Sequence, residues 1–402
     1  MNSIFEGFLC TPETLEAFGE RNFIAAMLRF EASLARAQAA VGLIPESAAQ
    51  SIIGTCKVDL FDTAKIVRES ARAGSLAIPM VKSLKETVAL FNPDAVAHVH
   101  FGCTSQDAID TAMAMVTREA LDLIAADTHK CVHALLNLAE LHPLTPILAR
   151  TLMQPASVTS FGFKCVAWAA PLVRSLQRLR TAMPHALKLQ LGGTVGTLAT
   201  MNGKGAQISE LMAHDLRLTM PTMSWHTQRD EWIALGCELG LLTGSLGKIA
   251  KDIVLMSQAE VGEVAEPSEA GRGGPSNMPY KHNPVACMVA IAASQRVPQR
   301  VAALLAVMPQ EHERAAGAWQ AELAEWPQLV ISAHGSARAL AQALPDLRVN
   351  ATRMLANLDA VRAQLSKADA DEWFAPSLAQ HAAQVTTTQT RALRDLLDQQ
   401  TA

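Results

Sequence analysis

The sequence predicts an all-α protein, and three features of its composition lead to that prediction. Only 4% of the 402 residues are aromatic and there is a single tyrosine, so the residue types that favour β-strands are scarce. The 22 glycines and 19 prolines are too few for the many turns of a β-sandwich or barrel. Half of the residues are hydrophobic and 18% are charged, which indicates a compact, folded chain.

The clearest helical pattern lies over about residues 226–266. Apolar residues recur there at spacings of four and three, an unbroken heptad stripe formed by Leu235, Leu239, Leu242, Leu246, Ile249, Ile253 and Met256. A stripe of small residues runs beside it, namely Gly236, Gly240, Gly244 and Gly247. Because each interior glycine costs about 1 kcal/mol relative to alanine, we expect neighbouring helices to approach this central helix closely. We also expect the bundle to continue across a subunit interface.

A second helix is predicted to begin at Ser105, after the segment Phe91–Cys103, which looks extended. Thr104 can cap it, and Asp107 lies at the spacing of a capping box. Further helices are expected near 157–182, 285–308 and 320–344. Together these predict an N-terminal helical domain over 1–100, a central long-helix bundle over 101–345 and a short C-terminal helical domain over 346–402.

Charge, hydropathy and cysteine spacing exclude several classes of protein. The formal net charge is −4 and no basic tract is interleaved with aromatic residues, so nucleic acid is not an expected partner. The longest apolar run, Val285–Ala293, is far shorter than the roughly 18 residues of a membrane span. The first residues lack the pattern of a secretory signal, so we expect a cytoplasmic protein. The seven cysteines contain no C-x-x-C and are expected to be reduced and mostly buried.

The segment 267–284 is predicted to be a mobile loop. Three glycines and three prolines between Gly271 and Pro284 cannot continue a helix. The loop carries Ser276, Lys281 and Asn283, and it leads into a helix whose N-terminus offers N–H groups to an anion. A hydroxyl, an ammonium and an amide in this position suit closure over a carboxylate substrate. A solvated connector is the alternative.

Three motifs, in the same order along the chain, resemble those of the fumarase/aspartase superfamily. The loop segment M-P-Y-K-H-N-P at 278–284 resembles the superfamily signature M-P-x-K-x-N-P. The segment H-F-G-C-T-S-Q-D at 100–107 is similar to H-x-G-x-T-S-x-D, and A-R-T-L-M-Q at 149–154 is similar to G-R-T-H-x-Q. Within the superfamily, the stretches 189–199, 283–287 and 308–314 most resemble the bacterial 3-carboxy-cis,cis-muconate cycloisomerases.

This resemblance implies a fold, an assembly and a set of site residues. The fold is a fumarase/aspartase-like three-region all-α fold, in a homotetramer with a twenty-helix core and active sites shared between three subunits. The substrate is a small polycarboxylate, with no metal and no organic cofactor. The implied catalytic residues are Ser276, Lys281 and Asn283. The implied substrate-binding residues are His100, Thr104, Ser105, Arg150, Thr151, Gln154, Met278 and Arg314.

Two positions depart from the superfamily pattern. In its elimination lyases a histidine of G-R-T-H helps to protonate the leaving group, and Leu152 stands there in this chain. The usual base is the first serine of the loop pair, and here that position is Pro275, which leaves Ser276. In lactonization the nucleophile is a carboxylate of the substrate itself, so no leaving group needs a proton, and the lactonizing branch also has an apolar residue in place of the histidine.

The sequence therefore predicts a cycloisomerase that converts 3-carboxy-cis,cis-muconate to 4-carboxymuconolactone in protocatechuate degradation. Ser276 or Lys281 is the predicted proton donor. Three alternatives stay open. One is an elimination lyase on a succinyl-type substrate, similar to adenylosuccinate lyase. The others are a catalytically inactive structural or binding paralogue and a cycloisomerase for a muconate with a different acidic substituent.

Overall fold

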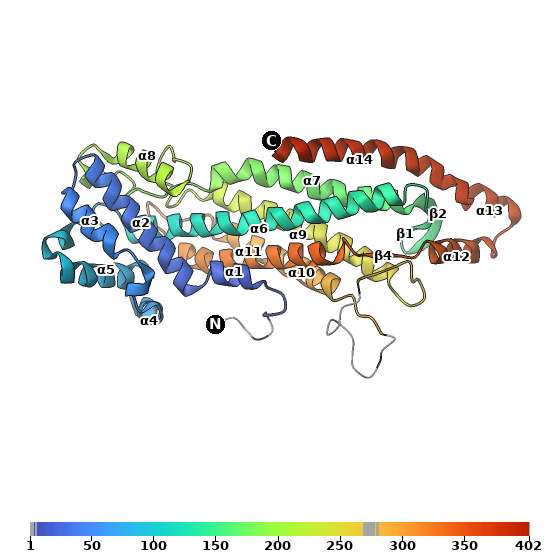
Figure 1. Ribbon diagram of the computed structural model, residues 1–402, viewed down its shortest axis with the longest axis horizontal. Coiled ribbons are helices and arrows are strands. Elements are labelled where there is room, and N and C mark those ends of the chain that lie inside the picture. The colour runs from blue at the N-terminus through green and yellow to red at the C-terminus, as the bar shows by residue number, and fades with distance from the viewer. Residues whose placement is uncertain (1–3, 5, 268–277, 279–280, 402) are drawn as a thin grey trace.

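The structure, a computed structural model, is an elongated assembly of helices and describes residues 4, 6–267, 278 and 281–401. Figure 1 shows small helices at both ends and long helices along the middle. Five long helices make the central bundle: α6 (Ser105–Leu141), α7 (Phe161–Ala186), α9 (Asp230–Met256), α10 (Val285–Ala306) and α11 (Ala318–Ala343). Neighbouring pairs pack α6 on α7, α7 on α9, α9 on α10, α10 on α11 and α11 on α6.

The central helix α9 confirms the predicted apolar stripe, because all seven of its members are buried. The glycine stripe also lies where helices approach closely. An added Cβ would lie 3.2 Å from Trp326 at Gly236, 3.0 Å from Val301 at Gly240 and only 2.2 Å from Ser294 at Gly247. At Gly244 no atom of a neighbouring element among the described residues lies within 4 Å of that position, so the expected close approach does not occur there.

The predicted bounds of α9 were wrong at both ends. The helix begins at Asp230 rather than near residue 226, and it ends at Met256 rather than at 266. Beyond it the chain turns through Gly262, whose φ of +59° is left-handed, into β3 (Val264–Ala265). That strand pairs antiparallel with β4 (Arg348–Val349). The pairing of β3 with β4 thus places residues 264–265 in a strand, although their local pattern predicted a helix.

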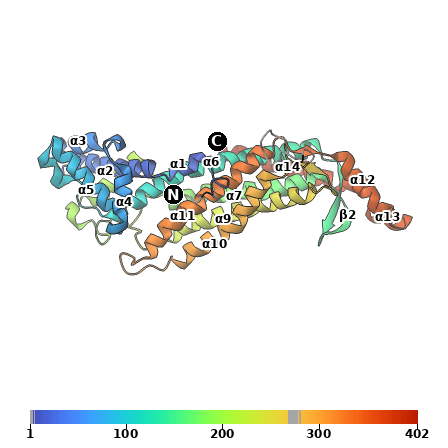
Figure 2. The ribbon, with the colours of Figure 1, turned by 90° about the horizontal axis from the view of Figure 1, so that it is seen from below.

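A β-hairpin that the sequence analysis did not predict precedes α7. It pairs β1 (Pro146–Thr151) with β2 (Gln154–Ser160), so residues 157–160 are strand rather than the expected helix. The side chain of Ser160 caps α7 by accepting a hydrogen bond from the amide of Phe163. The turn consists of Leu152 and Met153, both at positive φ, and Figure 2 shows the hairpin projecting away from the helices.

The N-terminal end contains α1 (Pro12–Ala17), α2 (Glu20–Ala40), α3 (Glu46–Thr55), η1 (Val58–Leu60), α4 (Thr63–Ala73) and α5 (Ala77–Phe91). The stretch 91–103 is not extended as predicted, because Pro93–His98 forms the 3-10 helix η2 with proline in its first turn. Between α7 and α9 lie η3 (Ala199–Met201) and α8 (Gly205–Leu216). Of the seven cysteines only Cys131, Cys165 and Cys287 are buried, so the expectation of mostly buried cysteines was wrong.

The C-terminal segment contains α12 (Ala351–Arg362), α13 (Lys367–Trp373), η4 (Pro376–Leu378) and α14 (Ala379–Thr401). Helix α14 runs back along the bundle and packs against α7 (Figure 1). The division at residues 100 and 345 stays a prediction. Among the described helices, α9 alone is long and apolar enough to cross a membrane, yet 56% of its apolar window is buried, as is usual for a core helix.

Candidate active site

Four of the predicted substrate-binding residues gather around the N-terminus of α6. They are His100, Thr104, Ser105 and Arg314, which we call the N-terminal cluster. The predicted capping box is present: the amide of Thr104 donates to Asp107 Oδ2 at 3.0 Å. Arg314 reaches the same turn, where its Nη1 donates to Thr104 Oγ1 at 2.6 Å. The helix N-terminus and the guanidinium together make this turn a suitable place for a carboxylate.

The buried carboxylate of Asp107 joins this turn to the segment 189–199. It accepts hydrogen bonds from the amides of Gly192 at 3.0 Å and Gly193 at 2.9 Å, and it lies 2.7 Å from Nε2 of His226. A Cβ on Gly193 would lie 2.9 Å from the carbonyl oxygen of Gly102, so the two backbones touch. His226 had no sequence signal of its own, because its contact with Asp107 spans 119 positions.

A groove of about 390 Å³ opens beside the N-terminal cluster. His100 and Ser105 line one side of it, and Lys82 and Lys85 of α5 line the other. Both lysines are exposed and lie three residues apart, on one face of the helix. They were not predicted from the sequence, because a pair of surface lysines on a helix carries no specific signal. The two lysines bring positive charge to the groove, although Glu86, which forms an ion pair with Lys82, lines it as well.

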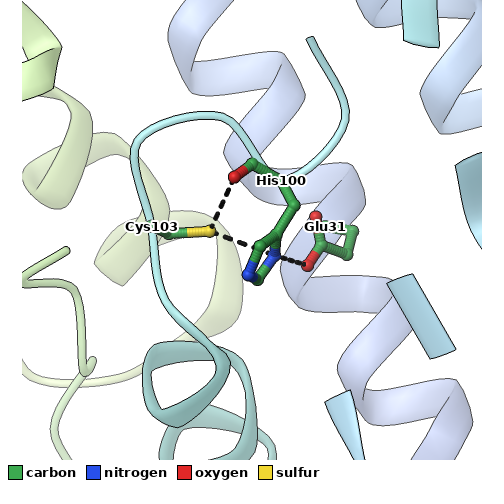
Figure 3. A group of neighbouring side chains, drawn as sticks. All are labelled: Glu31, His100 and Cys103. Carbon is green, nitrogen blue, oxygen red and sulfur yellow. Dashed lines mark hydrogen bonds and ion pairs between the residues drawn. The ribbon is translucent and has the colours of Figure 1, made fainter. Parts of the chain in front are cut away.

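His100 is held in an unusual conformation at the base of this groove. Its φ is +60°, and its Nδ1 lies 2.6 Å from Oε1 of the buried Glu31 and 3.1 Å from Sγ of Cys103 (Figure 3). Burial opposes the charged imidazole. The charge and hydrogen bond of Glu31, with a further contribution from Asp107, outweigh that effect and raise the pKa of His100.

Arg150 does not join the N-terminal cluster. Its guanidinium donates to both oxygens of Glu263, at 3.0 and 2.8 Å, and Asn357 donates to the same carboxylate at 2.9 Å. The Glu263 side chain is fully buried. This bidentate pair ties the hairpin to the segment after α9. In this chain a buried protein carboxylate therefore holds the guanidinium. Substrate binding by Arg150 stays a prediction.

Thr151 and Gln154 lie at the exposed hairpin tip, where Leu152 is 97% exposed. Helix α6 separates this tip from the N-terminal cluster. Its 37 residues, at about 1.5 Å each, make a rod of roughly 55 Å. One copy of the chain therefore does not bring these two groups of predicted residues together.

The signature loop forms a third group. Ser276, Pro275 and Arg272 lie outside the described residues. Met278 and Asn283 are half-buried and Lys281 is exposed, just before α10. The 22 residues of α10, about 33 Å, separate them from the segment that carries Arg314.

We expected the N-terminus of α10 to offer its N–H groups to an anion, but two of these groups are already bonded within the chain. The amides of Ala286 and Cys287 donate to the two carboxylate oxygens of Glu266, at 3.0 and 2.8 Å. An internal carboxylate already satisfies these two donors, which is common at helix N-termini.

Comparisons with known proteins agree with the motifs. The sequence profile of a family described as "Lyase" matches residues 9–298. The chain belongs to this lyase family. The 3-carboxy-cis,cis-muconate cycloisomerase of Pseudomonas putida is 42% identical over 358 residues, 89% of this chain and 85% of that protein. The nitrosuccinate lyase of Streptomyces davaonensis is 38% identical over 96% of this chain and 82% of that protein.

The solved structures lead to the same family. The crystal structure of 3-carboxy-cis,cis-muconate lactonizing enzyme from Pseudomonas putida superimposes with a TM-score of 0.85 at 39% identity. That match covers 98% of this lyase-family chain and 90% of the other. The predicted all-α fumarase/aspartase-like fold is thereby confirmed, and so is the predicted similarity to the lactonizing branch of the lyases.

Proposed function

We propose that this lyase-family chain is a 3-carboxy-cis,cis-muconate cycloisomerase, which lactonizes its substrate to 4-carboxymuconolactone during protocatechuate breakdown. The observation that carries the proposal is Leu152, an apolar residue at an exposed hairpin tip where the superfamily's elimination lyases have a histidine. The relatives named as cycloisomerases, 41–43% identical in three bacteria, support it.

Leucine at this position suits a reaction without a leaving group. In lactonization a substrate carboxylate oxygen bonds to a carbon of the conjugated diene, and a proton from a donor is added to the neighbouring carbon. Nothing departs, so no side chain needs to protonate an amine or a hydroxyl group. Counted as the free acids, substrate and lactone are isomers. At neutral pH the substrate trianion gains one proton at carbon and becomes a lactone with two carboxylates.

The developing charge is the main demand on the protein. As the carbon–oxygen bond forms, negative charge spreads onto the carboxylate beside the reacting carbon. Lys281 and Asn283, with backbone N–H groups of the signature loop, are the groups we assign to that charge. One preorganised donor to such an oxyanion is worth about 3–4 kcal/mol. Ser276 is the proton donor in this proposal.

The positive charge at the groove supports a polycarboxylate substrate. Arg314 and the α5 lysines place three cationic side chains near one helix N-terminus, although the net charge of the chain is −4. A substrate with three carboxylates needs such local cations, and the total charge of the protein says little about them.

The separation of the three groups supports a shared active site. We propose a homotetramer in which the N-terminal cluster, the hairpin tip and the signature loop of three different subunits meet. The lengths of α6 and α10 keep the N-terminal cluster tens of ångströms away from the other two groups in one chain. A cytoplasmic location, no membrane and no nucleic-acid partner belong to the same proposal.

An elimination lyase on a succinyl-type substrate is the second candidate. The relative named nitrosuccinate lyase, 38% identical over nearly the whole chain, favours it. The apolar Leu152 argues against it, because expulsion of a leaving group is helped by an acid at that position.

A turnover assay with purified protein separates the candidates. Loss of the diene absorbance of 3-carboxy-cis,cis-muconate, with the lactone identified by NMR, is the result we expect. Release of fumarate from nitrosuccinate or adenylosuccinate, with no reaction of the muconate, would favour elimination instead. Inactivity on all three, together with a thermal shift on adding a tricarboxylate, would indicate a binding paralogue.

A further inference from the structure

Three metal-ligating side chains meet beside the N-terminal cluster, to which one of them, His100, also belongs. Glu31 comes from the middle of α2, and His100 and Cys103 come from the loop that precedes α6 (Figure 3). Their ligand atoms all lie within 4.8 Å of one another, the one such group among the residues that the structure describes. We propose that these three side chains form a binding site for a transition-metal ion of the Zn²⁺ type.

The distances need only a small adjustment to admit an ion. Nδ1 of His100 lies 2.6 Å from Glu31 Oε1 and 3.1 Å from Cys103 Sγ. Tetrahedral Zn²⁺ with bonds of about 2.0–2.3 Å holds its ligand atoms roughly 3.3–3.8 Å apart. The imidazole therefore has to move away from the carboxylate and from the thiol by less than about 1 Å, within the range of ordinary rotamer adjustment.

The second oxygen of Glu31 independently indicates that a ligand is missing. The residue is 1% exposed, and its Oε2 has no hydrogen-bond partner among the described residues. Buried carboxylate oxygens are normally satisfied, since leaving one unpaired costs about 1–3 kcal/mol or more. A cation between Glu31, His100 and Cys103 would satisfy it.

The donor set also selects the class of metal. One sulfur, one imidazole nitrogen and one carboxylate oxygen suit Zn²⁺ or Co²⁺, whereas Mg²⁺ and Ca²⁺ prefer oxygen ligands alone. Three protein ligands leave a fourth position for water, as in an open zinc site. Binding releases to solvent the proton of the Cys103 thiol and the proton between His100 Nδ1 and Glu31, so neither an oxidant nor a reductant is required.

The backbone holds two of the ligands in place. His100 and Cys103 flank Gly102, whose φ is +76° and whose surroundings, Thr200 and Met201, lie 3.1–3.2 Å from where a Cβ would be. The loop therefore turns tightly and is packed, so the imidazole and the thiol face the same point on α2. A preorganised pair loses little conformational entropy on binding a metal.

Cobalt absorbance tests the proposal without reference to turnover, so its failure is distinguishable from failure of the proposed function. The full chain is stripped with EDTA and titrated with Co²⁺, and the thiolate-to-cobalt charge-transfer band in the near ultraviolet is recorded. We expect one Co²⁺ per chain, displaced by an equal amount of Zn²⁺. No band in the wild-type protein would overturn the site.

Two variants and one matched control locate the ion. Cys103→Ser should abolish the band, and Glu31→Gln should weaken Co²⁺ affinity at least tenfold. Cys237→Ser, which removes a half-exposed thiol elsewhere, should change neither. A band that persists in Cys103→Ser, with circular dichroism showing a native fold, would place the cobalt on another cysteine and refute the proposal.

Discussion

His226 Nε2 lies 2.7 Å from Asp107 Oδ1, and both side chains are buried although 119 residues separate them in sequence. The same carboxylate accepts the amides of Thr104, Gly192 and Gly193. One side chain thus caps α6 and holds the segment 189–199 against the N-terminal cluster. The position of the groove relative to α6 therefore depends on the Asp107 carboxylate.

Asp107→Asn should destabilise the protein, because the new amide NH₂ would face N–H donors. We expect the free energy of unfolding in urea to fall by about 3 kcal/mol. Asp122→Asn, on the exposed face of the same helix, is the control and should stay within about 0.5 kcal/mol of wild type. Equal stability of the two variants would show that Asp107 does not hold the two segments together.

Arg150→Met should also destabilise, since it leaves the buried Glu263 charge without its guanidinium. Loss of one partner of a buried ion pair costs about 3 kcal/mol or more, and adding Glu263→Gln should recover part of it. Urea unfolding of the single and double variants measures this coupling. The control is Arg174→Met, an exposed arginine of α7. Unchanged stability with a raised KM would instead mark Arg150 as a substrate ligand.

Two inactive variants should complement each other if active sites are shared. Arg314→Ala removes a cation of the N-terminal cluster and Gln154→Ala alters the hairpin tip. The two variants are denatured and refolded together. Random assortment of their subunits should then leave about a quarter of the active sites with both a native Arg314 and a native Gln154. Activity should then return to about that fraction of wild type, while each variant refolded alone stays inactive. No recovery in mixed tetramers of confirmed mass would contradict sharing between these groups.

The buried Asp127 should make stability depend on acid pH. Burial tends to raise its pKa, but hydrogen bonds with His334 and Arg338 and the charge of Arg338 lower the pKa of Asp127 to about 2. Its unfolded value is about 3.9, so the stabilisation, about 2 kcal/mol, is complete above that pH and is lost as pH falls toward 2. The difference in unfolding free energy between wild type and Asp127→Asn should therefore shrink by about 1 kcal/mol from about pH 5 to pH 3.

Asp122→Asn, which changes an exposed carboxylate of the same helix, is measured in parallel as the control for the substitution itself. A constant difference for Asp127→Asn would refute the assignment.

Ser276→Ala should slow turnover by 10²–10⁴-fold, roughly the range for loss of a general acid, with little change in KM. Ser268→Ala, in the same segment, is the matched control and should turn over at the wild-type rate. Steady-state kinetics on 3-carboxy-cis,cis-muconate give both constants. Full activity of Ser276→Ala would leave Lys281 as the proton donor.

The predictable part of the fold depended on local patterns. The stripe from Leu235 to Met256 and the capping box at Thr104 involve neighbours three or four positions apart, and both were confirmed. The hairpin at 146–160 was missed because its turn, Leu152 and Met153, lacks the glycine or asparagine typical of positive φ. Residues 257–266 were assigned to a helix because nothing local announces the pairing of β3 with β4.

In the candidate site, too, some features followed from local sequence patterns and others from tertiary contacts. The motifs by themselves determined the family and which residues to examine, since residue type and short spacing are local properties. Only the tertiary structure decided that Arg150 binds Glu263, that Glu266 caps α10 and that Lys85 faces His100 across a groove. The Arg150–Glu263 contact joins residues 113 positions apart, and its geometry depends on how whole helices pack. A local pattern carries no information about such packing.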